Sequence, residues 1–460
     1  MIAVVATFAS AAAADDLVQV MVDVAKPAGA TGKIRRLHGT NLAAPLDSDA
    51  RDNTEALKVL DIPLTRLHDA PLEGRGQRLV DVSCVFPLFH LDPQDPKNYY
   101  FAETDDYIQN CLNYGSKVLY RLGESIDHSK KRRRVFPPKD FDKWADICIN
   151  IIRHYNEGWA DGFHDNIEYW EIWNEADGGP RDCWMGTWSD YVRLYVTASK
   201  KIKSRFPNIK VGGPAMTGLH FDEMDQFLSE CKRQNAPLDF FSWHCYTSSP
   251  NDLIGQPGIA RTFLDQRGFT KAELHLNEWH CCFGGDFNGD PAQYRTFVET
   301  MGGPDAAAGV CAILSGWQDT PLAMGNYYTG TGVTWPGWGF YGLCGPHDLN
   351  KCYFAMKAFN LTTKYENRVA TQVRGDEKNT WALAGRKKNG SMAVLVSCFK
   401  SPAKRVAVQF TGCFTPPKKC SVRIVDGSHE LETVKDVQLS GTTVTIPKPA
   451  GSAVFLVEIE

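Results

Sequence analysis

The chain of 460 residues has no large excess of charge of either sign, since 50 Lys and Arg stand against 54 Asp and Glu. A formal net charge of −4 gives no general reason to expect a nucleic-acid partner. Beyond residue 14, the sequence lacks any apolar run that approaches the roughly 20 residues needed to span a membrane. Hydrophobic residues make up 43% of the chain and charged residues 23%. This composition is typical of a soluble globular protein, and we expect no membrane span.

The sequence also lacks the cysteine patterns of metal-binding proteins. Its 14 cysteines are scattered, with no CxxC pair and no Cys/His spacing typical of zinc. No metal or other cofactor is therefore expected. Two disulfide pairings stay open: Cys413 with Cys420 across a hairpin, and the adjacent Cys281 with Cys282.

Residues 1–14 form the one extended apolar stretch, and they end in small residues. This pattern is typical of the hydrophobic part and cleavage zone of a secretory signal peptide, which predicts a secreted or periplasmic protein. The basic segment that normally precedes such a stretch is missing. A start of the natural chain further upstream is therefore an open alternative.

Residues 31–365 repeat a rhythm of short apolar strand, loop and amphipathic helix. Residues 141–157 and 190–206 show the 3.6-residue spacing of helices. Such alternation predicts an α/β protein of the (β/α)₈ TIM-barrel class. The alternative, a doubly wound open sheet, normally has a glycine-rich phosphate loop after its first strand, and this sequence has none. The eight predicted strands are residues 35–41, 63–69, 117–123, 167–175, 209–215, 239–246, 272–279 and 309–317.

The character of the sequence changes after residue 365. Residues 366–460 contain short β-prone runs separated by Gly, Pro, Asn and Asp, which predicts an appended all-β sandwich. Residues 15–30 precede the barrel, and within them residues 16–24 alternate like a strand. We expect this N-terminal strand to join the sandwich, because both would otherwise leave sheet edges exposed.

Two of the predicted strands end in the same Asn–Glu pair, Asn174–Glu175 and Asn277–Glu278. The active site of a barrel lies at the carboxyl ends of its strands, so these residues are the first candidates for chemistry. A single glutamate in such a place is usually only solvated, but two matched ends are harder to dismiss. They fall on the fourth and seventh predicted strands, and carboxylates there can face each other across the barrel mouth.

Hydrolysis of a glycosidic bond uses such a pair. One carboxylic acid protonates the leaving oxygen, while a carboxylate on the other side attacks the anomeric carbon or activates water. Mutual repulsion keeps one member of the pair protonated near neutral pH, which separates the two roles. A retaining enzyme requires a separation of about 5–5.5 Å between the carboxyl groups, and no metal.

The segment YWEIWNEAD, residues 169–177, resembles the acid/base motif of family 39 of the glycoside hydrolases, which includes β-xylosidases and α-L-iduronidases. The resemblance covers the predicted barrel and extends to the appended β domain. It implies a retaining enzyme with Glu175 as acid/base and Glu278 as nucleophile. Ala176 stands where proline commonly follows the acid/base glutamate, so the sugar is left open.

The resemblance also implies roles for residues around the two glutamates. Asn174 would hydrogen bond the sugar 2-hydroxyl, Tyr246 would hold the nucleophile, and His244 would line the pocket, with a core histidine as the alternative. Trp317, at the end of the predicted eighth strand, would form the floor under the sugar ring. Three residues on the first two strands match positions that line such pockets: His38, Arg66 and His68.

Other residues on the predicted active-site face have two interpretations each. Trp335 and Trp338 lie in a glycine-rich loop after the eighth predicted strand, where they either stack on sugars or pack in the core. Trp170 and Trp243 are offset from the pocket-facing positions and are predicted to be core residues. The basic run at residues 129–134, after the third strand, is either a solvated loop or a contact for an anionic glycan.

The sequence thus predicts a retaining glycoside hydrolase that acts on an oligo- or polysaccharide, with a β-xylosidase-like exo-glycosidase as the favoured form. An endo-acting hydrolase is one alternative, and a groove lined by Trp184, Trp335 and Trp338 would support it. A carbohydrate-binding barrel without catalysis is another, although both carboxylates are present. The oligomeric state and the linkage are left open.

Overall fold

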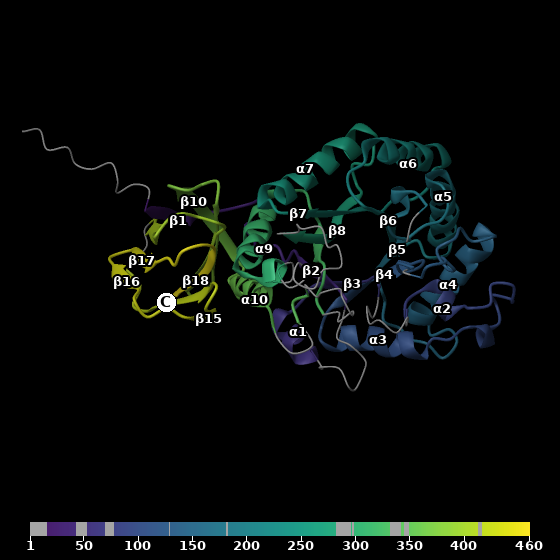
Figure 1. Cartoon of the computed structure of the whole chain (residues 1–460), viewed down its shortest axis with the longest axis horizontal. Helices are drawn as coiled ribbons and strands as arrows, with labels where there is room; N and C mark the ends of the chain where they lie inside the picture. The colour runs from purple at the N-terminus through teal and green to yellow at the C-terminus, as the bar shows by residue number, and fades with distance from the viewer. Residues whose placement is uncertain are drawn as a thin grey trace, which may run out of the picture. The chain divides into compact units, whose positions relative to one another are not determined.

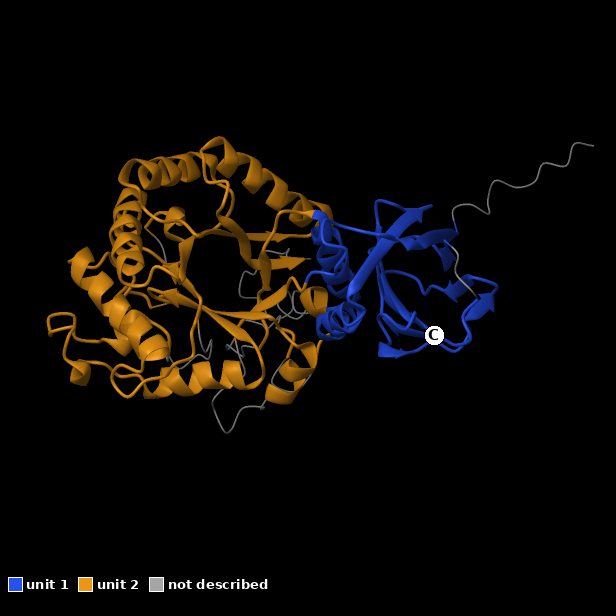
Figure 2. Cartoon of the chain, turned by 180° about the vertical axis from the view of Figure 1, so that it is seen from behind, with its two compact units in different colours: residues 1–35, 303–319, 351–460 blue, residues 36–302, 320–350 orange. Residues whose placement is uncertain are grey.

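A computed structural model gives the fold of the chain. It describes residues 16–42, 53–69, 78–127, 129–180, 183–281, 296, 299–331, 342–344, 349–412 and 416–460. The signal-like residues 1–14, together with Cys282 and Cys413 of the two open disulfide pairings, lie outside the described residues. Two compact units are present (Figure 2). The sheet unit comprises Met1–Arg35, Gly303–Asp319 and Lys351–Glu460, and the barrel unit comprises Arg36–Gly302 and Thr320–Asn350.

The barrel unit is a closed ring of eight parallel strands, with helices outside the ring (Figure 1). Each strand pairs with the next one along the chain, and the last pairs with the first. The predicted (β/α)₈ fold class is confirmed. The strands are β2 (His38–Asn41), β3 (Leu64–Leu67), β4 (Lys117–Leu122), β5 (Tyr169–Ile172), β6 (Lys210–Met216), β7 (Phe240–Thr247), β8 (Glu273–Cys281) and β9 (Met324–Tyr327).

The barrel helices begin and end at residues suited to those positions. In α4, the Asp140 side chain accepts a hydrogen bond from the Lys143 amide, and Gly158 ends the helix with a φ of +73°. None of the helices in the described ranges is long and apolar enough to cross a membrane. The helices of this unit are α1 (Thr54–Leu60), α2 (Val82–Val85), α3 (Ala102–Asn113), α4 (Phe141–Glu157), α5 (Trp188–Arg205), α6 (Phe221–Gln234) and α7 (Pro250–Gln266), with 3₁₀ turns η2 (Pro96–Asn98) and η3 (Ala176–Gly178).

The prediction of the eighth strand at residues 309–317 is wrong. These residues lie in helix α9 (Pro304–Gly316) and at the start of the 3₁₀ turn η4 (Trp317–Asp319), and the eighth barrel strand is β9. Helix α9 is buried continuously from Ala306 to Ser315, so its sequence is apolar on all sides and resembles that of a buried strand. Proline at the first helical position and three consecutive alanines favour a helix.

The sheet unit contains one continuous mixed sheet of ten strands, in the order β15-β14-β18-β12-β11-β10-β1-β13-β17-β16. The N-terminal strand β1 (Leu17–Pro27) pairs antiparallel with β10 and parallel with β13, so it lies inside the sheet. The strands therefore form a single curled sheet where two packed sheets were expected. The others are β10 (Asn367–Arg374), β11 (Thr380–Arg386), β12 (Met392–Cys398), β13 (Arg405–Thr411), β14 (Cys420–Val425), β15 (Glu430–Thr433), β16 (Gln438–Ser440), β17 (Thr443–Pro447) and β18 (Ala453–Ile459).

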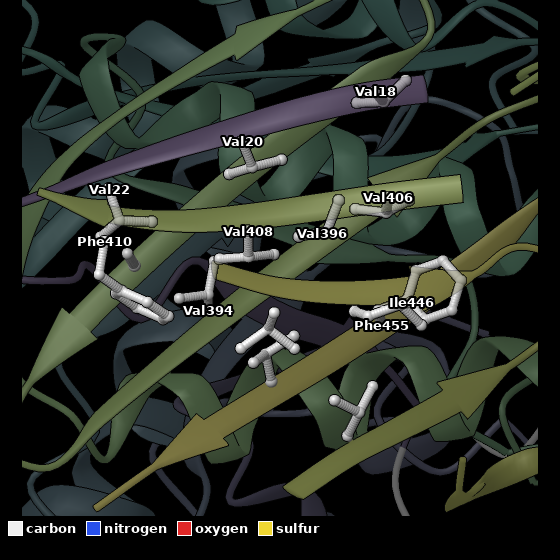
Figure 3. Close-up of a cluster of buried hydrophobic side chains, with 14 of the residues drawn as sticks. Val18, Val20, Val22, Val394, Val396, Val406, Val408, Phe410, Ile446 and Phe455 are labelled. Atoms are coloured by element: carbon white, nitrogen blue, oxygen red, sulfur yellow. The ribbon is translucent and has the colours of Figure 1, made fainter. Parts of the chain in front are cut away.

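The curled sheet encloses its own hydrophobic core (Figure 3). Alternate residues of β1 point into it, and they meet side chains from strands on both sides of β1 in the sheet order. Helices α9 and α10 (Lys351–Thr363) pack on the sheet, where the Ser397 hydroxyl donates to the Ala308 carbonyl at 2.6 Å. The core residues labelled in Figure 3 are Val18, Val20, Val22, Val394, Val396, Val406, Val408, Phe410, Ile446 and Phe455.

Truncation of Val20 tests the place of β1 in this core. Val20 is fully buried, so Val20→Ala is expected to lower the free energy of unfolding of the sheet unit by about 2 kcal/mol through lost methyl contacts and a new cavity. Urea denaturation of the whole chain measures it. Gln19→Ala on the exposed face of the same strand is the control, with an expected change below about 0.5 kcal/mol. Equal effects of both changes would contradict the burial of β1.

Candidate active site

Glu175 lies directly after the fourth barrel strand, in a backbone conformation that its neighbours hold. The Glu175 amide donates to the Ala215 carbonyl on β6 at 2.9 Å, and the Trp173 amide donates to the Leu122 carbonyl on β4 at 2.6 Å. Both Trp173 and Glu175 have positive φ angles, 69° and 46°. The strand therefore ends in a fixed turn that displays Glu175 at the carboxyl end of the barrel.

Glu278 lies in β8, the seventh barrel strand, next to a β-bulge. In the pairing with β7, Trp243 lies opposite Leu276 and His244 lies opposite Glu278, so Asn277 is the extra residue. Successive residues of a regular strand point to opposite faces, but a bulge changes that alternation. Asn277 and Glu278 consequently both point into the barrel, where each has a hydrogen-bond partner from another strand.

The two glutamates come together at a shared histidine. Nδ1 of His244 lies 2.8 Å from Oε1 of Glu175 and 3.4 Å from Oε2 of Glu278. The nearest side-chain nitrogen and oxygen atoms of the three residues all lie within 4.8 Å of one another. This separation fits the carboxyl spacing of retaining glycosidases, about 5–5.5 Å, and is shorter than the roughly 6.5–9.5 Å of inverting enzymes.

Both oxygens of Glu278 accept hydrogen bonds. The Tyr246 hydroxyl donates to Oε2 at 2.7 Å, and Nη1 of Arg66 donates to Oε1 at 2.7 Å. Glu278 is 5% exposed, so these donors replace the water that would otherwise solvate a carboxylate. The contacts fix the orientation of the side chain.

Arg66 connects the two glutamate-bearing strands beneath the pocket. Its Nε donates to Glu171 at 2.6 Å, and its Nη2 donates to the Asn174 side-chain oxygen at 2.7 Å. Burial acts to lower the pKa of Arg66, but the carboxylates of Glu171 and Glu278 outweigh burial and raise it. A permanent cation therefore lies fully buried between two carboxylates.

Glu171 has a structural position, as its deeper place on the strand predicts. It is fully buried, and besides Arg66 it accepts hydrogen bonds from the Ser242 hydroxyl at 2.6 Å and from the Asn277 side chain. All its contacts come from the barrel interior. Glu171 thus anchors Arg66, Ser242 and Asn277, which lie on three different strands.

The pKa values of Glu175 and His244 shift in opposite directions. Burial acts to raise the pKa of Glu175, but the hydrogen bond and charge of His244 outweigh burial and lower it. Burial acts to lower the pKa of His244, but Glu278 and Glu175 together raise it. Both shifts favour the proton on the imidazole of His244, which lies in direct hydrogen-bond contact with Glu175.

Cys183 was missed by the sequence analysis. It lies in the loop after β5 and is 6% exposed, with its thiol 3.5 Å from Oε2 of Glu175 and 3.8 Å from the Asn174 side-chain nitrogen. Asn174 is thereby held between Arg66 and this loop. Only its closeness to Glu175 in the sequence was available as a signal.

Of the two histidines predicted on the first two strands, one lies near Glu278 and the other does not. His68 is buried, with Nε2 at 3.8 Å from Glu278, and burial together with the charge of Arg66 holds its pKa well below the usual range. His38 instead contacts the Leu60 carbonyl of α1 at 3.2 Å, so it faces the helices outside β2. The predicted pocket role of His38 is not supported, because Asn41, on the opposite face of the strand, is the residue that points inward.

Trp317 does not end a strand, so its predicted role as the pocket floor has lost its basis. It lies fully buried in η4 of the sheet unit. The residue that does follow the eighth strand is Tyr328, which is 5% exposed and packs edge-on against Tyr246 with ring centroids 6.4 Å apart. Trp335 and Trp338 lie outside the described residues.

Glu175, His244 and Glu278 also have the spacing of a three-ligand metal site. Hydrogen bonds account for the cluster as it stands: His244 bridges the two carboxylates, and Arg66 and Tyr246 donate to Glu278. An ion at this place would bind next to the guanidinium of Arg66 and compete with these donors. The arrangement is thus that of an acid–base site.

Comparison with known proteins gives a consistent family. Residues 88–257 match the sequence model of the family "Glycosyl hydrolases family 39". A β-xylosidase of Geobacillus stearothermophilus is 28% identical over 247 residues, which cover 46% of this chain and 47% of that protein. A β-xylosidase of Caldicellulosiruptor saccharolyticus is 28% identical over 298 residues, with 58% and 57% covered. The chain thus spans about half the length of these relatives.

The fold of the whole chain is also found in a solved structure. The crystal structure of a glucosidase from Croceicoccus marinus matches 96% of this chain and 99% of its own, with a TM-score of 0.76 and 24% identity. That likeness concerns the fold, which includes both the barrel and the curled sheet. The segment matched by the family includes β4–β7 and Glu175. Residues 88–257 of this chain thus resemble the glycosyl hydrolases of family 39, and both curated relatives are β-xylosidases.

Proposed function

We propose that this protein is a retaining glycoside hydrolase that works by double displacement, with Glu175 as acid/base and Glu278 as nucleophile. The observation that carries the proposal is the short distance between the two carboxylates at the carboxyl end of the barrel, where both contact His244. The match of residues 88–257 to family 39 supports the same reaction class.

In the first step, one oxygen of Glu278 attacks the anomeric carbon, and Glu175 protonates the departing oxygen. The covalent glycosyl-enzyme is then hydrolysed by water, which Glu175 deprotonates as a base. Arg66 and Tyr246 hold the Glu278 carboxylate in position for the attack. Asn174, which Arg66 holds in place, is proposed to bind the sugar 2-hydroxyl.

The proton that Glu175 needs is held close by. The lowered pKa of Glu175 and the raised pKa of His244 both favour a resting pair with its proton on the imidazole. When a bound sugar separates Glu278 from His244, the imidazolium loses one of its two anionic partners. Transfer of the proton to Glu175 across the 2.8 Å contact then becomes easier, which prepares the acid for the first step.

The substrate is proposed to be a β-xyloside from which a terminal sugar is removed. Two β-xylosidases among the relatives support this proposal, whereas the matched crystal structure is a glucosidase. The two sugars differ by one hydroxymethyl group, a difference that a pocket discriminates by roughly 10- to 200-fold. The endo-acting alternative has lost one supporting residue, because Trp184 is fully buried and cannot line an open groove.

Hydrolysis of a panel of nitrophenyl glycosides, followed by proton NMR of the first-formed sugar, tests the reaction class. The proposal expects nitrophenyl β-xyloside to be the best substrate and β-xylose to appear before mutarotation. First appearance of the α-anomer would show an inverting enzyme. Binding of the sugars without any turnover would favour a carbohydrate-binding barrel.

His244→Asn is expected to move the alkaline limb of the kcat/KM profile to lower pH by about one unit or more. The raised pKa of His244 lets the pair keep its proton until the pH passes that value, so the acid remains available. Without the imidazole, Glu175 must hold the proton alone, with the lower intrinsic pKa of a carboxyl group. The profile is measured with an aryl glycoside.

His275→Asn is the matched control for this change. His275 is also buried and hydrogen bonds to Glu273 at 3.2 Å, but it lies near the start of β8, at the end of the strand opposite to Glu278. Its removal should leave both limbs of the profile in place. An unchanged alkaline limb in His244→Asn would contradict the role given to the pair.

A further inference from the structure

A cavity of about 1050 Å³ lies in the barrel unit, separate from the two glutamates. It is lined by Arg78, Arg133 and Arg134 together with Tyr100 and Ser83, among others, and we call it the basic groove. Glu103 is the acidic residue in its lining. Three guanidinium groups against one carboxylate give the groove a positive charge, although the chain as a whole is slightly acidic.

The groove is on the active-site face of the barrel. Residues 78–104 follow β3, and residues 123–135 follow β4, so both walls come from segments that begin at the carboxyl ends of strands. A buried network joins the walls: Asp81 accepts from Nη2 of Arg121 at 2.8 Å and from the Ser125 amide at 2.9 Å. Glu124 accepts from the Ser83 amide at 3.0 Å across the same junction. The groove is therefore a built feature of the two loops.

The basic run at residues 129–134 has a defined conformation. The carboxylate of Asp127 accepts hydrogen bonds from the backbone amides of Ser129, Arg133 and Arg134, at 3.1, 2.7 and 3.3 Å. These hydrogen bonds to Asp127 fix the backbone conformation of the loop. The side chains of Arg133 and Arg134 then line the groove.

Arg133 and Arg134 have no carboxylate partner among the residues that the structure describes. Within the described parts of the chain, no ion pair involves Arg133 or Arg134, and Nη1 of Arg134 contacts the Cys84 sulfur at 3.6 Å. Arg78 donates to the Ser125 carbonyl at 3.0 Å and has its nearest carboxylate, Asp81, at 4.0 Å. Glu124 does not neutralise them, because burial and the charge of Asp81 raise its pKa to about 8.

An exposed aromatic ring accompanies these charges. Tyr100 is 64% exposed, the largest value among the exposed large hydrophobic residues of the described chain. Its amide donates to the Val85 carbonyl at 2.9 Å, and its neighbours Tyr99 and Phe101 are buried and stacked with ring centroids 5.4 Å apart. A ring held at the surface in this way can stack against the C–H face of a sugar.

The groove adjoins the loops of the catalytic pocket. The Val135 carbonyl, directly after the basic run, accepts from the Met185 amide at 2.7 Å. Met185 belongs to the same loop as Cys183, whose thiol contacts Glu175. The charge of Arg78 is also one of those that lower the pKa of His68 beside Glu278. The wall of the groove is thus hydrogen bonded to the loop that contacts Glu175.

We propose that the basic groove binds the carboxylate of a uronic acid residue, so that the preferred substrate is an anionic oligosaccharide whose scissile bond lies at Glu175 and Glu278. Arginine pairs with carboxylates through two parallel hydrogen bonds, and Tyr100 offers the sugar ring a stacking surface. This inference rests on the proposed function for the position of the scissile bond, but binding at the groove can be measured without turnover.

Calorimetric titration of the whole chain with two probes tests the groove. The probes are a xylo-oligosaccharide that carries one glucuronate branch and the unbranched oligosaccharide of the same length. The branched probe is expected to bind about tenfold more tightly at low salt, and Arg133→Ser/Arg134→Ser should remove that difference. Hydrolysis of nitrophenyl β-xyloside by this variant should stay within twofold, because so small a substrate does not extend into the groove.

Lys130→Ser/Lys131→Ser is the matched control, because it removes the same charge from the same loop but neither residue lines the groove. It should keep most of the preference for the branched probe. Equal binding of the two probes by the unmodified protein would overturn the proposal. So would equal losses in the two variants, or tighter binding of a sulfated oligosaccharide or a single-stranded oligonucleotide than of the uronate probe. Failure to cleave any glycoside, with the uronate preference intact, would count against the catalytic proposal alone.

Discussion

Glu278→Ala is expected to lower turnover of an aryl glycoside on the order of 10⁵-fold, since it removes the proposed nucleophile. Glu278 is held by Arg66 and Tyr246, and no other carboxylate has the same position in the described chain. Azide at high concentration should restore activity, because it fits the space left by the side chain. The glycosyl azide formed should have the anomeric configuration opposite to that of the substrate.

The contrast with Glu175→Ala makes this test specific. Loss of the proposed acid/base is expected to lower turnover by about 10²- to 10⁴-fold, less with a good leaving group, and azide should give the product of retained configuration. Glu273→Gln, at the other end of β8, is the control and should keep full activity. Full activity of either catalytic variant, or the same azide anomer from both, would contradict the assignment.

Arg66→Met is expected to lower the free energy of unfolding of the barrel by about 3–5 kcal/mol. The change leaves Glu171 fully buried without its counter-ion, and uncompensated buried charges have effects of this size. Activity should fall as well, because Glu278 loses a hydrogen-bond donor and Asn174 loses its support. Urea denaturation and aryl glycoside kinetics measure the two effects.

Two further variants test whether the unpaired charge of Glu171 causes the loss of stability. Arg66→Met/Glu171→Leu should be more stable than Arg66→Met alone, because it removes the orphaned carboxylate as well. Arg193→Met removes an exposed ion pair with Asp190 and should change stability by less than about 1 kcal/mol. If Arg66→Met were as mild as Arg193→Met, the buried ion-pair network would not have the role that its geometry indicates.

The barrel was predictable from the sequence because seven of its eight strands are short apolar runs bounded by loops, so their pattern is unambiguous. The eighth was not, because α9 is buried on all sides and shows no amphipathic period, whereas β9 has only four residues, Met324–Tyr327. This error also misplaced one predicted site residue. Trp317 was predicted to end the eighth strand, but the residue that follows that strand is Tyr328.

The pairing of Glu175 with Glu278 followed from matched strand ends, but the partners of these residues did not. The bulge at Asn277 turns two consecutive side chains inward, and nothing in the local sequence marks it. Arg66 was identified as a pocket residue, yet its bonds to Glu171 and Asn174 depend on the closure of the barrel. The predicted pocket role of His38 depended on which residues of the strand face inward. That alternation cannot be counted when the first residue of the strand is not known, and β2 begins at His38, not at residue 35.

The curled sheet shows what local sequence periodicity cannot predict. Alternating residues predicted that β1 would join the C-terminal strands, and it lies between β10 and β13. Whether such strands form two packed sheets or one curled sheet is decided by hydrogen bonds between strands distant in sequence. Local periodicity is the same in both cases.

Glu278 is proposed to form a covalent bond to the sugar. Incubation with a 2-deoxy-2-fluoro-β-xyloside that has a good leaving group tests it, because the fluorine slows both steps while the leaving group keeps the first one fast. Mass spectrometry of the digested protein should then find one fluoroxylosyl group, attached to Glu278. A label on another residue, or complete turnover without any label while the sugar product appears inverted, would contradict the account.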